Sequence, residues 1–141
     1  MSGLGKSELY EFVIRHRYGV VATTHADGSS QSALVGIAVS PDLEIYFDTI
    51  GDTRKGKNLR RDPRISVVIG WENEQSVQIE GVADEPKGAD LAALKVVYYA
   101  AWPDGPSREN WPGVTWVRIK PRWIRFSDFN RADGAVREMK L

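Results

Sequence analysis

The chain has 141 residues, with 19 basic and 19 acidic side chains and no cysteine. This length fits one domain with its own core, and the even charge balance argues against nucleic-acid and membrane-surface proteins, which need an overall basic bias. The missing cysteines exclude disulfides, thiolate metal sites and cysteine nucleophiles.

The N-terminal segment predicts a helix and gives no sign of a targeting sequence. Ser7 can cap a helix over residues 7–16, in which Leu9, Phe12 and Val13 recur at helical spacing. The segment has no apolar run of signal-peptide length, and no later stretch approaches the length of a membrane span. We therefore expect a soluble, cytoplasmic protein.

Three strand-like segments follow the first helix. They are YGVVATTHADG from residue 18, QSALVGIAV over 31–39 and LEIYFDTI over 43–50, and they are separated by turn signals at 26–29 and 40–42. Each segment is rich in β-branched and apolar residues, so the three together predict an antiparallel meander.

The rest of the chain alternates short helices and strands. Thr53 can cap a helix over 54–61, which Pro63 prevents from continuing. The later predicted elements are strands at 64–71 and 76–85, a helix at 88–101, and strands at 114–120 and 122–129 separated by a bend at Pro121. This order predicts a mostly β fold with flanking helices: a six- to seven-stranded antiparallel barrel in one domain (1–129), followed by a loosely held C-terminal tail (130–141).

The stretch GDTRKGKNLRRDPR, residues 51–64, concentrates positive charge directly after a predicted strand. The first turn of a helix presents free N–H groups and a partial positive charge. Thr53 adds a hydroxyl, Arg54 a planar fork suited to phosphate, and Lys55 a point charge. The stretch therefore predicts a phosphate site, and the alternative is that its charges are only solvated on a surface helix.

The order of short motifs resembles a known family. The motifs are Phe47-Asp48-Thr49, Thr53-Arg54-Lys55, Asp62-Pro63-Arg64 and Val77 to Gly81. Together they resemble the flavin-binding split-barrel family, whose best-known member is pyridoxamine 5'-phosphate oxidase, and within it the small general-stress-protein branch. The resemblance implies an antiparallel split barrel that forms a homodimer and holds FMN between its two subunits.

The resemblance also implies roles for individual residues. Arg54 and Lys55 match the phosphate ligands, and Thr49 matches a position near the ribityl phosphate. Ser76 matches a glutamine that faces the flavin, and Gln78 lies on the same side of its strand. With Trp111 as an aromatic residue that covers the ring across the dimer, the expected cofactor-binding residues are Ser32, Ala33, Leu34, Val35, Thr49, Thr53, Arg54, Lys55, Ser76, Gln78 and Trp111.

The function that the resemblance implies is a flavin-dependent oxidoreductase acting on a small-molecule substrate, with no metal and no nominated catalytic residue. Two alternatives keep the fold. The segment KNLRRDPR resembles a deazaflavin-binding reductase branch equally well. The predicted strand SALVGIA is uncharged where the oxidase has an arginine and a lysine, which favours a flavin-binding protein without turnover. Haem ranks last, because the two histidines, His16 and His25, are poorly placed as axial ligands.

Overall fold

The computed structural model describes residues 3–133 and 135–141, which form eight strands, three α-helices and one 3-10 turn. The helical elements are α1 (Lys6–Val13), α2 (Arg54–Arg61), α3 (Gly88–Ala101) and η1 (Gly105–Arg108). The strands are β1 (Tyr18–Thr24), β2 (Ser30–Gly36), β3 (Ala38–Val39), β4 (Ile45–Ile50), β5 (Arg64–Ile69), β6 (Gln75–Asp84), β7 (Val114–Asp128) and β8 (Val136–Lys140).

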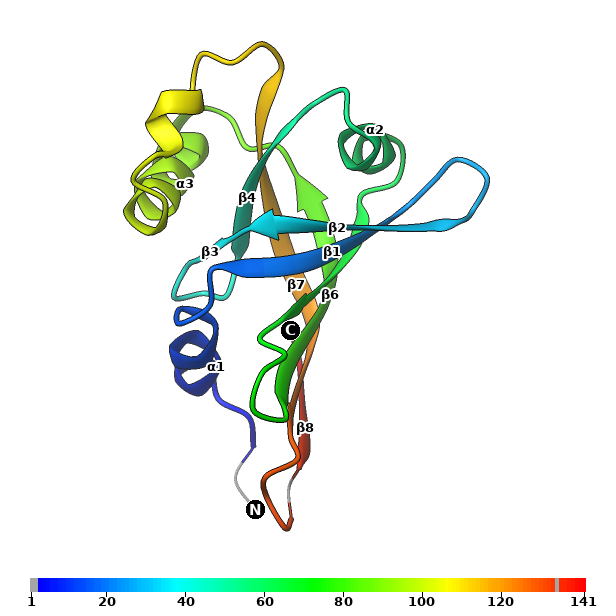
Figure 1. Cartoon of the computed structure of the whole chain (residues 1–141), viewed down its shortest axis with the longest axis vertical. Helices are drawn as coiled ribbons and strands as arrows, with labels where there is room; N and C mark the ends of the chain where they lie inside the picture. Colours follow the sequence, from blue (N-terminus) through cyan, green and yellow to red (C-terminus); the bar gives the residue numbers. More distant parts are fainter. Residues whose placement is uncertain (1–2, 134) are drawn as a thin grey trace.

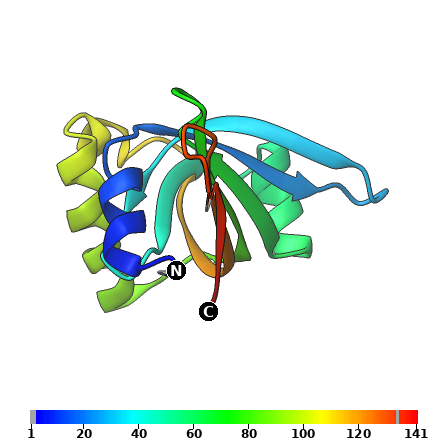
Figure 2. The same ribbon diagram turned by 90° about the horizontal axis from the view of Figure 1, so that it is seen from below.

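The strands form one antiparallel sheet that curls into a half-barrel. Its order is β2-β1-β5-β6-β7-β4-β3, and β8 pairs with β7. The consecutive strands β2 and β3 lie at opposite ends of this order, and β2 also contacts β4, so the two ends of the sheet approach each other (Figures 1 and 2). The predicted mostly β barrel with flanking helices is confirmed, with eight strands in place of six or seven.

Alternating side chains of the strands fill the interior of the half-barrel. Buried side chains from seven strands, β1 to β7, and from α1 form one apolar cluster, which includes Val21, Phe47, Val67, Ile79, Ile119 and Leu9. A second cluster lies outside the barrel, where α3 packs Leu94 and Tyr98 against Tyr46 and Trp116. No helix in the described ranges is long and apolar enough to cross a membrane.

The predicted meander is correct only for its first hairpin. β1 pairs with β2 across the turn at residues 25–28, as expected. β4, however, pairs with the two-residue β3 and with β7, so the third segment does not continue the meander. The chain instead leaves β2 after Gly36 and crosses to the other end of the sheet, which brings the two ends of the half-barrel near each other.

The bend expected at Pro121 does not end the strand, because β7 runs unbroken from Val114 to Asp128. A proline cannot donate to the ladder, and the structure accommodates it with a β-bulge. Glu80 pairs with Trp123 while Gly81 pairs with Pro121, which leaves Arg122 as the extra residue. A Cβ atom on Gly81 would overlap the carbonyl oxygen of Lys120.

Gly81→Ala is therefore expected to lower the free energy of unfolding by about 1–3 kcal/mol, because backbone atoms must move to accept the methyl group. Urea unfolding at neutral pH measures the change. Gly3→Ala is the control, since a Cβ atom there meets nothing within 4 Å. Equal midpoints for the two variants would contradict this account of the bulge.

Part of the C-terminal tail is a paired strand, contrary to the expectation that 130–141 is loosely held. Residues 136–140 form β8 against β7. Arg137 donates to Glu8 of α1 at 2.9 and 2.5 Å, and its guanidinium lies 5.4 Å from the centre of the Phe126 ring. The tail is thus held by a contact between the two ends of the chain.

This ion pair predicts a pH-dependent contribution to stability. The hydrogen bond from Arg137 holds the pKa of Glu8 below its ordinary value, against the opposing effect of burial. A carboxyl whose pKa is lowered by folding stabilises above its unfolded pKa of about 4.3, and the contribution is lost as pH falls through the folded pKa. Glu8→Gln should cost less than about 1 kcal/mol at pH 7, because Glu8 is partly exposed.

The difference between Glu8→Gln and the parent protein should then shrink as pH falls below the unfolded pKa of about 4.3, and it should vanish once Glu8 is protonated in the folded protein as well. Thermal unfolding across this pH range is the measurement. Glu11→Gln serves as the control because Glu11 is exposed on the same helix. A Glu8→Gln effect that is independent of pH would show that the ion pair is not its cause.

Candidate functional site

The start of α2 is fixed directly after β4 by two threonines. The Thr53 hydroxyl donates to the carbonyl of Ile50 at 2.7 Å and accepts from the N–H of Gly56 at 3.4 Å. Thr49 is buried, and its hydroxyl lies 3.2 Å from that of Thr53. Thr53 therefore caps α2, as its sequence position predicted.

The first turn of α2 presents two cations. Arg54 is exposed, Lys55 is half-buried, and no hydrogen bond within the described ranges uses their backbone N–H groups. Burial lowers the pKa of Lys55, and the nearby Asp48 carboxylate opposes that shift. An anion that replaced lost hydration around Lys55 would favour its charged form, so this turn suits a phosphate group.

The other basic residues at the end of α2 are occupied by structural contacts. Arg60 donates to the carbonyl of Gly51 at 2.6 Å and to Glu85 at 3.2 Å, while Arg61 donates to the carbonyl of Thr24. The basic stretch thus divides into a first turn with available cations and a last turn that holds α2 to its neighbours.

Asn58 fixes the position of α2 relative to the sheet. It is 1% exposed, and its side-chain NH₂ donates to the Thr23 hydroxyl of β1 and to the Gln31 side chain of β2, both at 2.9 Å. Sequence reasoning missed this residue, because an asparagine in a basic helix looks solvent-exposed and its partners lie far away in the chain.

A cavity of about 400 Å³ lies between the first turn of α2 and the strands β1 and β2. Its lining combines five of the predicted site residues with the strand residues on which α2 rests. The lining residues are Val21, Thr23, Ser30, Gln31, Ser32, Ala33, Thr53, Arg54 and Lys55. Because β2 ends the sheet order, alternate backbone N–H and C=O groups beside this cavity point away from β1.

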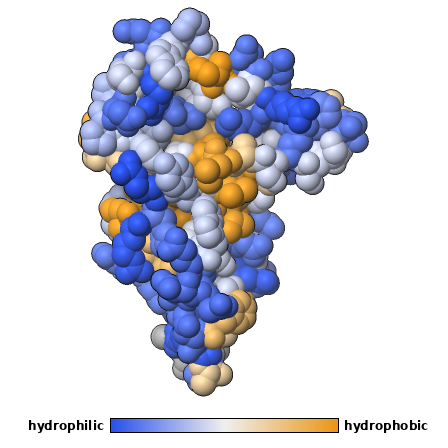
Figure 3. All heavy atoms as spheres, viewed as in Figure 1, coloured by the Kyte–Doolittle hydropathy of each residue, from blue (hydrophilic) through white to orange (hydrophobic). Residues whose placement is uncertain are grey.

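The remaining predicted residues do not line this cavity. Val35 is buried in the core, whereas Leu34 is 61% exposed on the outer face of the sheet. The strand register runs Leu34–Val20–Val68–Gln78, so Gln78 lies on the same outer face three strands away, at about 14 Å. Ser76 lies two residues before Gln78 on β6. Figure 3 shows that hydrophobic atoms gather over β1 and β2.

Trp111 is also separate from the cavity residues. It is 54% exposed in the loop between η1 and β7. Most of the predicted residues therefore fall into three groups: the α2 cavity, the outer face of the sheet, and one exposed loop tryptophan. Val35 lies in the core, and the buried Thr49 supports Thr53 from below the cavity without lining it.

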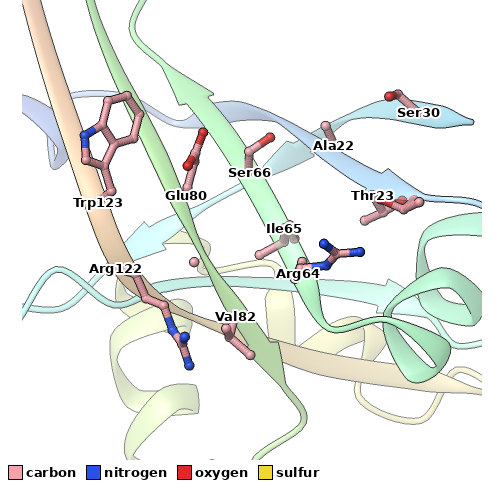
Figure 4. A pocket seen from close by; sticks show the side chains of 12 residues that line it. Ala22, Thr23, Ser30, Arg64, Ile65, Ser66, Glu80, Val82, Arg122 and Trp123 are labelled. Carbon is pink, nitrogen blue, oxygen red and sulfur yellow. The ribbon is translucent and has the colours of Figure 1, made fainter. Parts of the chain in front are cut away.

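A second hollow of about 460 Å³ lies on the outer face of the sheet. Figure 4 shows Ser66, Glu80 and Trp123 on neighbouring strands, with Arg64 and Arg122 at one end. Thr23 and Ser30 line both hollows, so this one adjoins the α2 cavity across β1 and β2. Sequence reasoning did not predict this hollow, because the register of five strands creates it.

A partly buried polar cluster joins β4 to α3 and η1. Asp48 of β4 accepts hydrogen bonds from the Tyr98 hydroxyl at 3.0 Å and from the Arg108 Nε at 3.2 Å. Burial raises the pKa of Tyr98 above its ordinary value, and the Asp48 charge adds to the shift. The charge of the same carboxylate also raises the pKa of Lys55 against the effect of burial. Asp48 therefore interacts with α3, with η1 and, through its charge, with the Lys55 cation of the cavity.

A family model described as pyridoxamine 5'-phosphate oxidase matches residues 6–128. The pyridoxine/pyridoxamine 5'-phosphate oxidase of Bordetella pertussis is 34% identical over 71 residues, which cover 50% of this chain and 34% of that protein. The match thus spans about a third of the length of that curated relative.

Solved structures share the fold, and two of them illustrate the likeness. A heme binding protein from Mycobacterium smegmatis gives a TM-score of 0.83 at 18% identity, covering 99% of this chain and 60% of that chain. The general stress protein 26 from Bacillus anthracis gives a TM-score of 0.73 at 20% identity, covering 95% of this chain and 97% of that chain. At these identities the likeness concerns the fold alone.

Proposed function

Because this chain belongs to the pyridoxamine 5'-phosphate oxidase family, we propose that it binds FMN and acts as a flavin-dependent oxidoreductase on a small molecule. One observation carries the proposal: Thr53, Arg54 and Lys55 line a single cavity with the free edge of β2. The match to the family model spans this entire site.

The residues of the cavity fit the chemical groups of FMN. The N–H groups of the first turn of α2 can donate to a phosphate, with Arg54 and Lys55 supplying charge. The unpaired backbone groups of β2 suit the polar edge of a planar ring. When bound, FMN supplies two-electron transfer, and the protein contributes binding, orientation and exclusion of water.

We further propose that two copies associate through the outer face of the sheet. Leu34, Val20 and Val68 form a row there that ends at Gln78. Within one protomer Gln78 lies about 14 Å from Leu34. This distance is too long for both residues to contact the same end of one flavin ring. In a two-fold dimer Ser76 and Gln78 of each protomer would reach the cofactor of the other, and the loop of Trp111 would cover the ring.

Titration of cofactor-free protein with FMN, followed by flavin fluorescence, tests the proposal. We expect saturable binding with a dissociation constant below about 10 μM, typical of a site with charged hydrogen bonds to phosphate. Reduction of the bound flavin by a nicotinamide donor, followed by rapid reoxidation, would support turnover. Absence of binding at tens of micromolar would defeat the proposal.

Deazaflavin is the second candidate, because the same phosphate site suits either cofactor and KNLRRDPR resembles both branches. Haem is disfavoured at this cavity, since neither histidine lines it and His16 is bonded to the carbonyl of Phe12 at 2.8 Å. A flavin-binding protein without turnover also fits the uncharged β2. The visible spectrum of the isolated protein separates the three ligands.

A further inference from the structure

A groove of about 510 Å³ separates α1 from α3, on the other side of the molecule from α2 (Figures 1 and 2). Its floor is the β2–β3 connection and β3, with Ile37 and Val39, and its walls include Val13 of α1 and Val97 of α3. It shares no lining residue with the cavity at α2. Its volume lies within the range of about 300–1,000 Å³ that is common for small-molecule sites.

The walls of the groove are apolar but partly exposed. Ile14 is 51% exposed and Val96 is 73% exposed, and both line it. Ala100, one helical turn after Val96, leaves space at the inner wall. Hydrophobic atoms are visible between α1 and α3 in Figure 3, and such a patch around a groove is typical of a binding surface.

One end of the groove is cationic, and no carboxylate from the part of the chain that the structure describes lines it. His16 and Arg17 follow α1 and belong to the lining. The Arg17 guanidinium lies 4.1 Å from the centre of the Trp102 ring, which also lines the groove. Within residues 3–133 and 135–141 no ion pair involves Arg17, so its positive charge at this end is not neutralised by the protein.

The Trp102 side chain holds this end rigid. Its Nε1 donates to the carbonyl of Ile37 at 2.9 Å, and its ring packs edge-on against Tyr18. The guanidinium stacked on it is therefore positioned before any ligand arrives, which lowers the entropic cost of binding an anion.

We propose that this groove binds a small amphipathic carboxylate, with its apolar chain between α1 and α3 and its carboxylate against Arg17. The apolar walls exclude fully polar anions, and the cationic end distinguishes a carboxylate from a neutral molecule of the same shape. The site is independent of the flavin site, so the two proposals stand or fall separately.

Calorimetric titration of the intact protein with octanoate and with 1-octanol tests the site. We expect octanoate to bind at least about tenfold more tightly than 1-octanol, because only the carboxylate forms a charged hydrogen bond with Arg17. Arg17→Gln should remove this preference while leaving 1-octanol binding unchanged. Ala100→Leu should weaken both ligands by about tenfold or more, because the added side chain fills the groove.

Ala92→Leu is the matched control, since Ala92 is exposed on the same helix and does not line the groove. It should leave both affinities unchanged. Octanoate binding that is undetectable at millimolar concentration, or that survives Ala100→Leu, would overturn the proposal. The proposal would also be overturned if light scattering showed that the protein is a dimer and that Val96→Asp converts it to monomers, because a second copy would then cover the groove.

Discussion

Arg54→Glu is expected to raise the dissociation constant for FMN by about 30-fold or more, which corresponds to about 2 kcal/mol. Arg54 lines the cavity at the start of α2, where its guanidinium can form a charged hydrogen bond to phosphate. The substitution removes that bond and adds repulsion. Fluorescence titration measures the affinity, and the melting temperature should hardly change because Arg54 is exposed.

Lys57→Glu provides a matched control for charge. Lys57 is exposed on the same helix and undergoes the same change of charge, but it does not line the cavity. Its effect on FMN affinity should be no more than a few-fold, because solvent and salt screen an exposed charge. Equal losses for the two variants would show that FMN responds to the overall charge of α2 and not to a site at its first turn.

Asn58→Ala is expected to lower the free energy of unfolding by about 3 kcal/mol. Two hydrogen bonds are lost, and the buried Thr23 hydroxyl loses its donor; each unsatisfied buried group costs about 1–3 kcal/mol. FMN binding should weaken as well, measured at a temperature where the variant is folded, because Thr23 and Gln31 line the same cavity as Lys55.

Chemical denaturation measures the stability of this variant, and Asn110→Ala is its control because Asn110 is exposed in a loop. The second test is the double variant Asn58→Leu with Thr23→Val. Replacing both partners of a buried hydrogen bond by apolar groups costs less than removing one of them, so this variant should be more stable than Asn58→Leu alone. The reverse order would contradict the role assigned to Asn58.

The elements that the sequence predicted well are those with strong local signals. The Thr53 cap, the stop at Pro63 and the helix over 88–101 all appear as expected. Pro121 misled the prediction because the bulge that tolerates it depends on Gly81, which lies on another strand. A local signal for a break was thus overruled by pairing with a distant residue.

The C-terminal strand and the supports of the site were hidden for a related reason. The charged residues of 136–140 suggest a solvated tail, yet Arg137 donates hydrogen bonds to Glu8, which lies near the opposite end of the chain. In the same way the sequence pointed to the cations of α2 but not to Asn58, or to the Asp48 cluster that acts on Lys55. Buried polar partners of this kind depend on tertiary contacts that no spacing rule reveals.

Comparing the affinities of FMN and riboflavin for the same protein tests the central claim most directly, because the two ligands differ only in the phosphate. If the first turn of α2 binds that phosphate, the unaltered protein should bind FMN at least about 30-fold more tightly, and Arg54→Glu should erase most of the difference. Equal affinities of the unaltered protein for FMN and riboflavin would contradict the claim.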